Sequence, residues 1–140
     1  MVLPDYISRL AVSSVLNRKT QLYGKNFLFD GNPETCWQSD PHLPQWIKIE
    51  FKQPIRIESL KIQFQGGFAA EEAELTLWTK ETIDDKASYP FYPTDSNNLQ
   101  SFEFKDDRAY TNALIVFRKG TDLFGRVIVY QLNFTFTSAL

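Results

Sequence analysis

The chain has 140 residues, of which 43% are hydrophobic and 15% aromatic, and its formal net charge is −2 at neutral pH. This length favours one domain, residues 1–140, and the aromatic content excludes an intrinsically disordered chain. The balance of acidic and basic residues argues against direct binding of nucleic acid, which requires a basic excess.

The N-terminal residues 1–10 lack the charged start and the unbroken apolar run of a secretory signal peptide. No apolar run in the chain approaches the roughly 20 residues that cross a bilayer. A single cysteine, Cys36, excludes an intramolecular disulfide. We therefore expect a protein of the nucleus, the cytoplasm or both, whose first five residues are poorly ordered.

Apolar and polar residues alternate along the chain with the two-residue period of β-strands, whereas no apolar face with the period of a helix persists for three turns. In residues 45–51, every second residue from Ile47 is apolar. In residues 55–64 the apolar phase changes near Glu58–Ser59, which predicts a β-bulge or a bend between sheets. Further strands are expected at residues 73–79, 88–92, 99–104, 112–117 and 126–136.

The last of these segments alternates most strongly along its length. Its apolar residues are expected to share one face: Ile128, Tyr130, Leu132, Phe134 and Phe136. Most proline and glycine residues fall between the segments, where they favour turns. About eight short strands in one domain predict an all-β fold, either an antiparallel β-sandwich or a barrel.

Residues 27–40 mix aromatic and turn-forming residues in a pattern that is typical of neither a strand nor a helix. Residues 30–33, Asp-Gly-Asn-Pro, have the composition of a tight turn, since Asp and Asn tolerate left-handed geometry and Gly has no Cβ. Trp37 is expected to anchor this segment in the core, because burial of an indole removes a large apolar area from water.

The pattern F-D-G-N-x-x-T-x-W-x-S at residues 29–39 is followed by Q-W-I-K-I-E-F at 45–51 and P-I-R-I-x-S-L-K-I at 54–62. This succession resembles the coagulation factor V/VIII type C, or discoidin, family. The resemblance implies an antiparallel jelly-roll β-sandwich of the galactose-binding type.

Longer blocks, at residues 13–40, 45–51, 61–68 and 124–132, resemble one group within this family, the small single-domain repressors that associate with orphan nuclear receptors. This resemblance implies a non-enzymatic intracellular protein-interaction module, a transcriptional co-regulator that binds nuclear receptors. The alternative is a lectin-like domain that binds a carbohydrate or another small ligand.

Many discoidin-like domains hold a structural calcium ion in the turn that corresponds to residues 30–33. The resemblance would place its ligands at Phe27, Asp30, Asn32, Thr35 and Gln131. Gln131 stands where the family often has a glutamate, and calcium prefers six to eight oxygens that include charged ones. The alternative is a bare turn, in which the Asp30 side chain caps its own backbone and no cofactor is required.

Three loops are expected to meet at one end of the sandwich, where rigid sheets commonly present binding loops. They are residues 39–45, 65–72 and 119–126. The candidate residues for binding a ligand or partner are Asp40, His42, Gln65, Gly66, Gly67, Phe68, Asp122, Phe124 and Arg126.

In the binding interpretation, Phe68 or Phe124 serves as an apolar anchor, Arg126 as a bidentate donor, and Gln65 and Asp122 orient a polar ligand. The alternative is structural: the two phenylalanines pack on each other or on the core, and Arg126 pairs with Asp122. For a carbohydrate ligand, the relevant set is His42, Trp46, Phe68 and Arg126.

The sequence offers no arrangement typical of catalysis. His42 is the sole histidine and lies in a loop between prolines, and a general base also needs a positioned partner. Cys36 precedes the anchoring Trp37, which favours an inert buried thiol. The carboxylates of residues 71, 72 and 74 read as a solvated charge run, and with the negative net charge they disfavour binding to anionic membranes.

Overall fold

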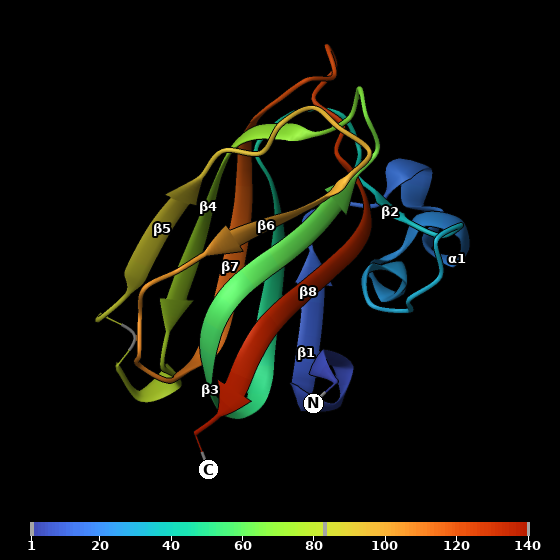
Figure 1. Ribbon diagram of the computed structural model, residues 1–140. Coiled ribbons are helices and arrows are strands. Elements are labelled where there is room, and N and C mark those ends of the chain that lie inside the picture. The colour runs from blue at the N-terminus through green and yellow to red at the C-terminus, as the bar shows by residue number, and fades with distance from the viewer. Residues whose placement is uncertain (1, 83, 140) are drawn as a thin grey trace.

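The computed structural model describes residues 2–82 and 84–139, in which eight antiparallel strands form one continuous sheet that folds over on itself (Figure 1). Antiparallel pairing is expected for short alternating segments joined by turns rather than by long helical crossovers. The strands are β1 (Ile7–Val12), β2 (Trp37–Gln38), β3 (Gln45–Phe64), β4 (Ala70–Trp78), β5 (Ala87–Phe91), β6 (Leu99–Glu103), β7 (Tyr110–Gly120) and β8 (Ile128–Ser138).

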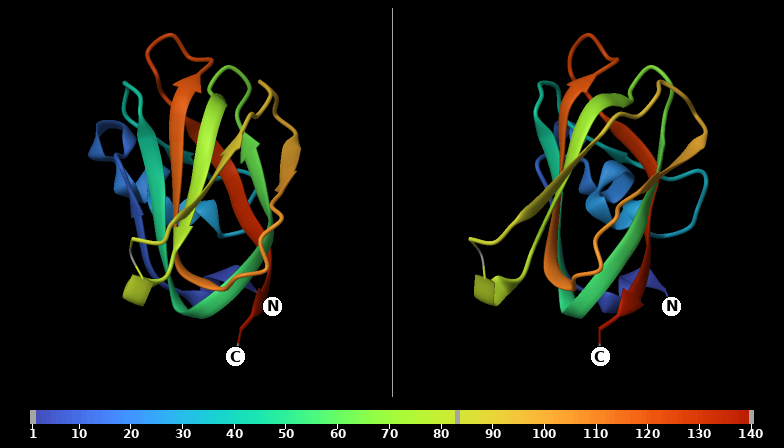
Figure 2. Two further views of the ribbon diagram at one scale, coloured as in Figure 1. Left: turned by 90° about the vertical axis from the view of Figure 1, so that its left-hand side faces the viewer. Right: turned by 60° about the vertical axis from the view of Figure 1, so that its left-hand side comes forward.

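The long strand β3 turns the sheet into a sandwich. Its first half pairs with β1 and β7, and its second half pairs with β6 and β8. The register with β7 shifts between Glu50 and Ile55, at the point where β3 bends from one layer into the other. The two layers are therefore β1–β3–β7–β4–β5 and β6–β3–β8–β2, seen face to face in Figure 2.

Short helical turns cover the side of the sandwich where β1 and β2 lie (Figure 1). They are the 3-10 turns η1 (Leu3–Tyr6), η2 (Leu16–Arg18) and η3 (Lys25–Leu28) and the single-turn helix α1 (Thr20–Tyr23); a further 3-10 turn, η4 (Lys80–Thr82), follows β4. Leu3 and Leu28 are almost fully buried. The expectation of a poorly ordered N-terminus is thus wrong for Leu3, which joins the core. Among the described residues, no helix has the length and apolar character of a membrane span.

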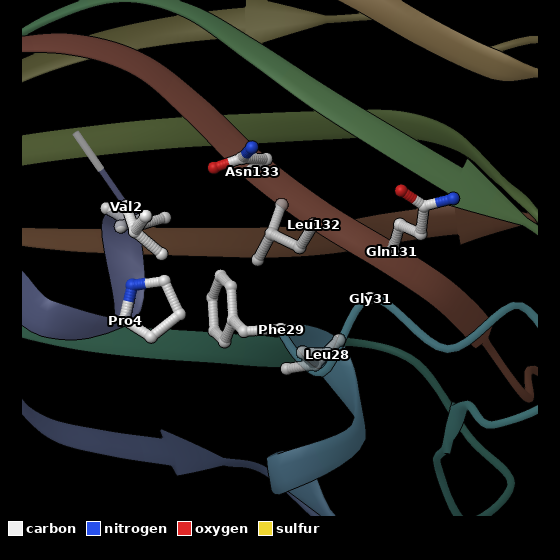
Figure 3. Close-up of a pocket in the computed structure, with 9 residues that line it drawn as sticks. Val2, Pro4, Leu28, Phe29, Gly31, Gln131, Leu132 and Asn133 are labelled. Carbon is white, nitrogen blue, oxygen red and sulfur yellow. The ribbon is translucent and has the colours of Figure 1, made fainter.

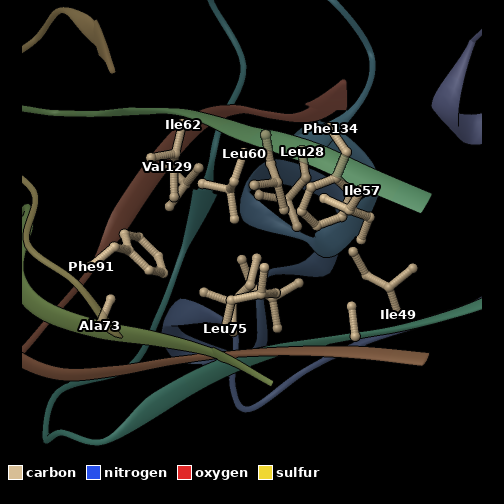
Figure 4. Packing of buried hydrophobic residues seen from close by; sticks show 14 of the residues in the cluster. Leu28, Ile49, Ile57, Leu60, Ile62, Ala73, Leu75, Phe91, Val129 and Phe134 are labelled. Atoms are coloured by element: carbon tan, nitrogen blue, oxygen red, sulfur yellow. The ribbon is translucent and has the colours of Figure 1, made fainter. Parts of the chain in front are cut away.

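The core lies between the two layers, and both contribute fully buried aliphatic side chains (Figure 4). Aromatic residues then join the layers. The ring of Phe117 on β7 lies 5.9 Å from that of Phe64 on β3 and 6.3 Å from that of Trp37 on β2. All three rings are completely buried, so the anchoring role expected of Trp37 is confirmed.

The phase change predicted in β3 is confirmed as an irregularity in its pairing with β8. The register shifts between Ile57 and Ser59, so that Glu58 is the extra residue and the apolar phase changes after it. A second shift lies opposite residues 63–64 of β3, and before it the expected face of β8 is wrong, since neither Ile128 nor Tyr130 belongs to the core cluster. Val129 faces the core, whereas Tyr130 is only partly buried.

Candidate functional site

The turn at residues 30–33 is closed by its own side chains. The Asp30 carboxylate accepts the backbone N–H of Asn32 at 3.0 Å and the Thr35 hydroxyl at 2.5 Å. The Asn32 side chain accepts the backbone N–H of Glu34 at 2.9 Å. Asp30 therefore caps its own turn, as the bare-turn interpretation expects.

The proposed calcium ligands fit the ion poorly. Asp30 is their sole carboxylate, and both of its oxygens already accept hydrogen bonds. Gln131, on the wall of a cavity of about 230 Å³ beside Gly31 and Phe29 (Figure 3), donates its amide to Gln63 at 2.9 Å. No group of three or more His, Cys, Asp or Glu side chains that could hold a metal exists within the described part of the chain. The calcium site stays a prediction.

We expect calcium to leave the stability of the protein unchanged. An excess of calcium chloride, added after treatment with a chelator, should not move the midpoint of thermal unfolding, because one carboxylate and neutral oxygens make a weak site. The Asp30→Ala variant should lose about 1 kcal/mol of unfolding free energy, since the turn loses an acceptor for two donors. A saturable rise of the midpoint with calcium in the wild type, absent in Asp30→Ala, would contradict this expectation.

The three predicted binding loops do meet at one end of the sandwich (Figure 2). We call residues 39–45, 65–72 and 119–126 the rim. The backbone N–H of His42 donates to the carbonyl of Phe124 at 2.8 Å. The backbone N–H of Thr121 donates to the carbonyl of Ala69 at 3.0 Å, which joins the third loop to the second. Backbone hydrogen bonds therefore fix how the loops lie relative to one another.

Arg126 is held by two rim residues. Its guanidinium carbon lies 4.7 Å from the centre of the Phe68 ring, within the range of a cation–π contact. Its Nε lies 3.4 Å from a carboxylate oxygen of Asp122, and the same oxygen accepts the Arg126 backbone N–H at 3.0 Å. The pairing of Arg126 with Asp122 thus follows the structural alternative, and Phe68 is half-buried beneath the guanidinium. Phe124, by contrast, is 65% exposed.

A fourth loop, residues 92–98, supports the rim and was not predicted. The backbone N–H groups of Gly66 and Gly67 each donate at 2.7 Å, to side-chain oxygens of Asn97 and Asp95 respectively. The Gln65 amide oxygen accepts the hydroxyl of Tyr130 at 3.1 Å. Asp, Ser and Asn in this loop were a signal for such contacts, because their side chains readily bind exposed backbone N–H groups.

Gln45 holds the first rim loop in place. It was not among the residues that the sequence predicted for the site. It is 5% exposed, and its amide nitrogen donates to the carbonyls of Asp40 and His42 at 3.1 and 2.6 Å. Its amide oxygen accepts the hydroxyls of Ser13 and Ser14 at 2.5 and 2.8 Å. Asp40 itself accepts the backbone N–H of Asn17. The side chain of Asp40 therefore braces the loop against η2, while the side chain of His42 is exposed.

The Cys36 thiol and the acidic residues that begin β4 both lie in surroundings that are typical of structural rather than reactive groups. Burial raises the pKa of the Cys36 thiol, against a weaker opposing effect of a hydrogen bond from Gln38. Such a thiol is poorly ionised and hence a poor nucleophile. In the charge run that begins β4, Glu72 pairs with Lys119 at 3.5 Å and Glu74 with Arg118 at 3.2 Å.

An electrostatic cluster around a buried carboxylate lies at the other end of β7, away from the rim. The Asp106 side chain is 4% exposed and accepts the hydroxyls of Tyr89 and Tyr110, both at 2.5 Å, and the guanidinium of Arg108 at 3.2 Å. Burial alone would raise the pKa of the Asp106 carboxyl group, but the hydrogen bonds from Arg108 and the two tyrosines outweigh it and hold that pKa well below its usual range. The cluster ties edge strand β5 to the start of β7.

This cluster predicts a pH dependence of stability. Because its pKa is lowered by folding, ionised Asp106 stabilises the protein above the ordinary aspartate pKa of about 3.9, and this contribution fades as the pH falls toward the folded value. Asp106→Asn should lower the free energy of unfolding at neutral pH by about 1–2 kcal/mol. Urea titrations across the acid range measure both effects, and an equally steep acid decline in wild type and variant would contradict the assignment.

The sequence profile of the F5/F8 type C family that is described as a NedA-like, galactose-binding domain matches residues 27–112. A relative in Danio rerio named nuclear receptor 2C2-associated protein is 44% identical over 122 residues, which are 87% of this chain and 86% of the relative. The protein of the same name in Homo sapiens is 44% identical over 139 residues, 95% of this chain and 93% of the relative.

Solved structures with the same fold include carbohydrate-binding modules of Clostridium perfringens. The module CpGH89CBM32-5, in complex with GalNAc-β-1,3-galactose, has a TM-score of 0.74 at 18% identity and covers 90% of this chain and 93% of its own. The family 32 module of NanJ, in complex with galactose, has a TM-score of 0.75 at 14% identity, with 92% and 93% covered. These likenesses establish the jelly-roll fold of the galactose-binding type. The chain belongs to the F5/F8 type C, or discoidin, family, in which the nuclear receptor 2C2-associated proteins are its relatives.

Proposed function

We propose that this protein is a non-enzymatic interaction module that binds a nuclear receptor through the rim and represses transcription in the nucleus. One observation carries the proposal: the identity of 44% with the human nuclear receptor 2C2-associated protein extends over 95% of this chain. Similarity over the whole domain, rather than over one motif, favours a shared surface and a shared kind of partner.

The rim suits binding better than catalysis. Its loops are tied to one another and to the sheets by backbone hydrogen bonds, which is how rigid scaffolds present recognition loops. Among the described residues, no hydrogen bond joins the His42 side chain to a carboxylate or to a nucleophile, and the Cys36 thiol is buried. General acid–base chemistry requires such a positioned partner.

Calorimetric titration of this protein with purified human nuclear receptor 2C2 tests the proposal. We expect saturable binding of one copy per receptor subunit, together with repression of a receptor-driven reporter gene when the protein is expressed in the nucleus. Absence of binding by a protein whose circular dichroism spectrum shows it to be folded would refute the proposal.

A carbohydrate ligand is the second candidate, favoured by the likeness in fold to modules bound to galactose. The residues available here support it less well. The guanidinium of Arg126 covers one face of the Phe68 ring, which a sugar would need for stacking. Trp46 alternates with buried Gln45 and Ile47 and so points to the outer face of the sheet. Galactose should therefore cause no saturable shifts in amide NMR signals of the rim.

A further inference from the structure

The β7–β8 loop ends in a tight turn, residues 122–125, that is closed on several sides. Gly125 donates its backbone N–H to the carbonyl of Asp122 at 3.0 Å, and Arg126 donates to the Asp122 carboxylate at 3.0 Å. His42 holds the Phe124 carbonyl from the neighbouring loop. Gly125 has a φ of +80°, and a Cβ there would lie 3.0 Å from backbone atoms of His42. The turn is thus rigid and packs directly on loop 39–45.

This rigid turn presents two large apolar side chains to solvent. Leu123 is 90% exposed, the highest value for a large hydrophobic residue among those described, and the adjacent Phe124 is 65% exposed. The loop that carries them projects beyond the end of the sandwich in Figure 2. The sequence drew attention to Phe124 and missed Leu123. Adjacent exposed apolar residues on an ordered turn are typical of a binding anchor, because little conformational entropy remains to be lost on binding.

The net charge around the turn indicates the charge of the partner surface that it can bind. The rim and loop 92–98 together hold five carboxylates against two cations, a net charge of −3 with His42 neutral, although the whole chain has only −2. The acidic residues are Asp40, Glu71, Glu72, Asp95 and Asp122, and the basic ones are Lys119 and Arg126. Such a surface repels anionic membranes and complements a basic one.

We propose that Leu123 and Phe124 insert together into an apolar cleft of a folded protein partner, and that lysine and arginine side chains edge this cleft. The inference deepens the proposed function and rests on it, because the partner is the nuclear receptor. A projecting turn with two apolar side chains requires a concave, apolar acceptor. Phe68 stays beneath Arg126 and supports the rim without entering the partner.

The test compares Leu123→Ser, Phe124→Ser and the double variant with the wild type, by calorimetric titration against purified human nuclear receptor 2C2. Loss of one buried leucine or phenylalanine contact should weaken binding about tenfold or more, and the double variant should not bind measurably. The matched control is Leu22→Ser on α1, where an equally apolar side chain is 58% exposed, and its affinity should stay within about twofold of the wild type.

The outcomes separate the two proposals. If the wild type fails to bind the receptor, the proposed function is refuted and the inference falls with it. If the wild type binds and the Leu123 and Phe124 variants bind equally well, only the inference is overturned. Because both side chains are exposed, the midpoint of thermal unfolding of the variants should match that of the wild type. Flotation of the wild type, but not of the double variant, with phosphatidylserine vesicles would identify a membrane as the acceptor and also overturn the inference.

A second variant tests the rigidity of the turn. Asp122→Ala removes the acceptor for the backbone N–H and the guanidinium of Arg126 and leaves both anchor side chains in place. We expect a smaller loss of affinity than from either serine variant, because both apolar anchors remain and the variant removes only the preorganisation of the turn and one of the five acidic groups around it.

The salt dependence of wild-type binding tests the charge of the cleft. Higher ionic strength should weaken binding, because basic residues edge the cleft. Binding that is insensitive to salt would contradict that part of the proposal.

Discussion

Replacing Trp37 with alanine should lower the free energy of unfolding by about 3–5 kcal/mol, the largest loss that we expect from a single substitution. The indole is completely buried, its ring contacts Phe117 of the opposite layer, and its N–H donates to the carbonyl of Ser14 at 2.9 Å. Since small domains are stable by only about 5–15 kcal/mol, the variant should lie near the limit of folding.

Urea denaturation followed by circular dichroism measures this loss, and Trp37→Phe separates its causes. Phenylalanine keeps much of the apolar volume but cannot donate to Ser14, so this variant should lose only about 1–2 kcal/mol. If both variants lost the same amount, the hydrogen bond rather than burial would be the main contribution of Trp37.

Replacing Gln45 with leucine should cost about 2–4 kcal/mol and loosen the first rim loop. Leucine fills a similar volume but leaves the carbonyls of Asp40 and His42 and the hydroxyls of Ser13 and Ser14 without the amide. The loss should be accompanied by faster hydrogen exchange at the amides of residues 39–45.

Gln38→Leu is the matched control for this substitution. The Gln38 side chain is half-buried, and its amide makes one weak contact, with the Cys36 sulfur at 3.5 Å. Its replacement should change the free energy of unfolding by less than about 1 kcal/mol. Equal losses in the two variants would show that the Gln45 amide is not the brace of the loop.

The sequence predicted most of the strands because burial on one face of a sheet produces alternation. It predicted less well where geometry interrupts that rule. Neither β1 nor the two-residue β2 was expected. Residues 7–12 alternate weakly, and none of them is fully buried in the structure. The shift in register that moves Tyr130 off the core face of β8 depends on the partner strand, and a single strand's own pattern cannot reveal it.

The sequence predicted which loops form the candidate site, but not which contacts their side chains make. The family resemblance located the three rim loops, but the sequence could not decide between binding and packing roles for Phe68, Phe124 and Arg126. Gln45 did carry a signal, because it occupies the inward phase of the alternation that continues through Ile47. A polar residue at such a position must satisfy its hydrogen bonds inside the protein. Asp106 had no comparable signal, since its neighbours resemble an ordinary solvated loop.

The sharing of β3 by both layers has a consequence for how the domain comes apart. β1, near the start of the chain, pairs with the first half of β3, and β8, near its end, pairs with the second half. Neither layer can open without disturbing the same strand, so amides throughout β3 should exchange with a single, global opening free energy. Removal of β1 or of β8 would also leave one edge of β3 without a partner strand. Because the free backbone groups of such an edge can pair with a strand of another molecule, these truncated proteins should self-associate.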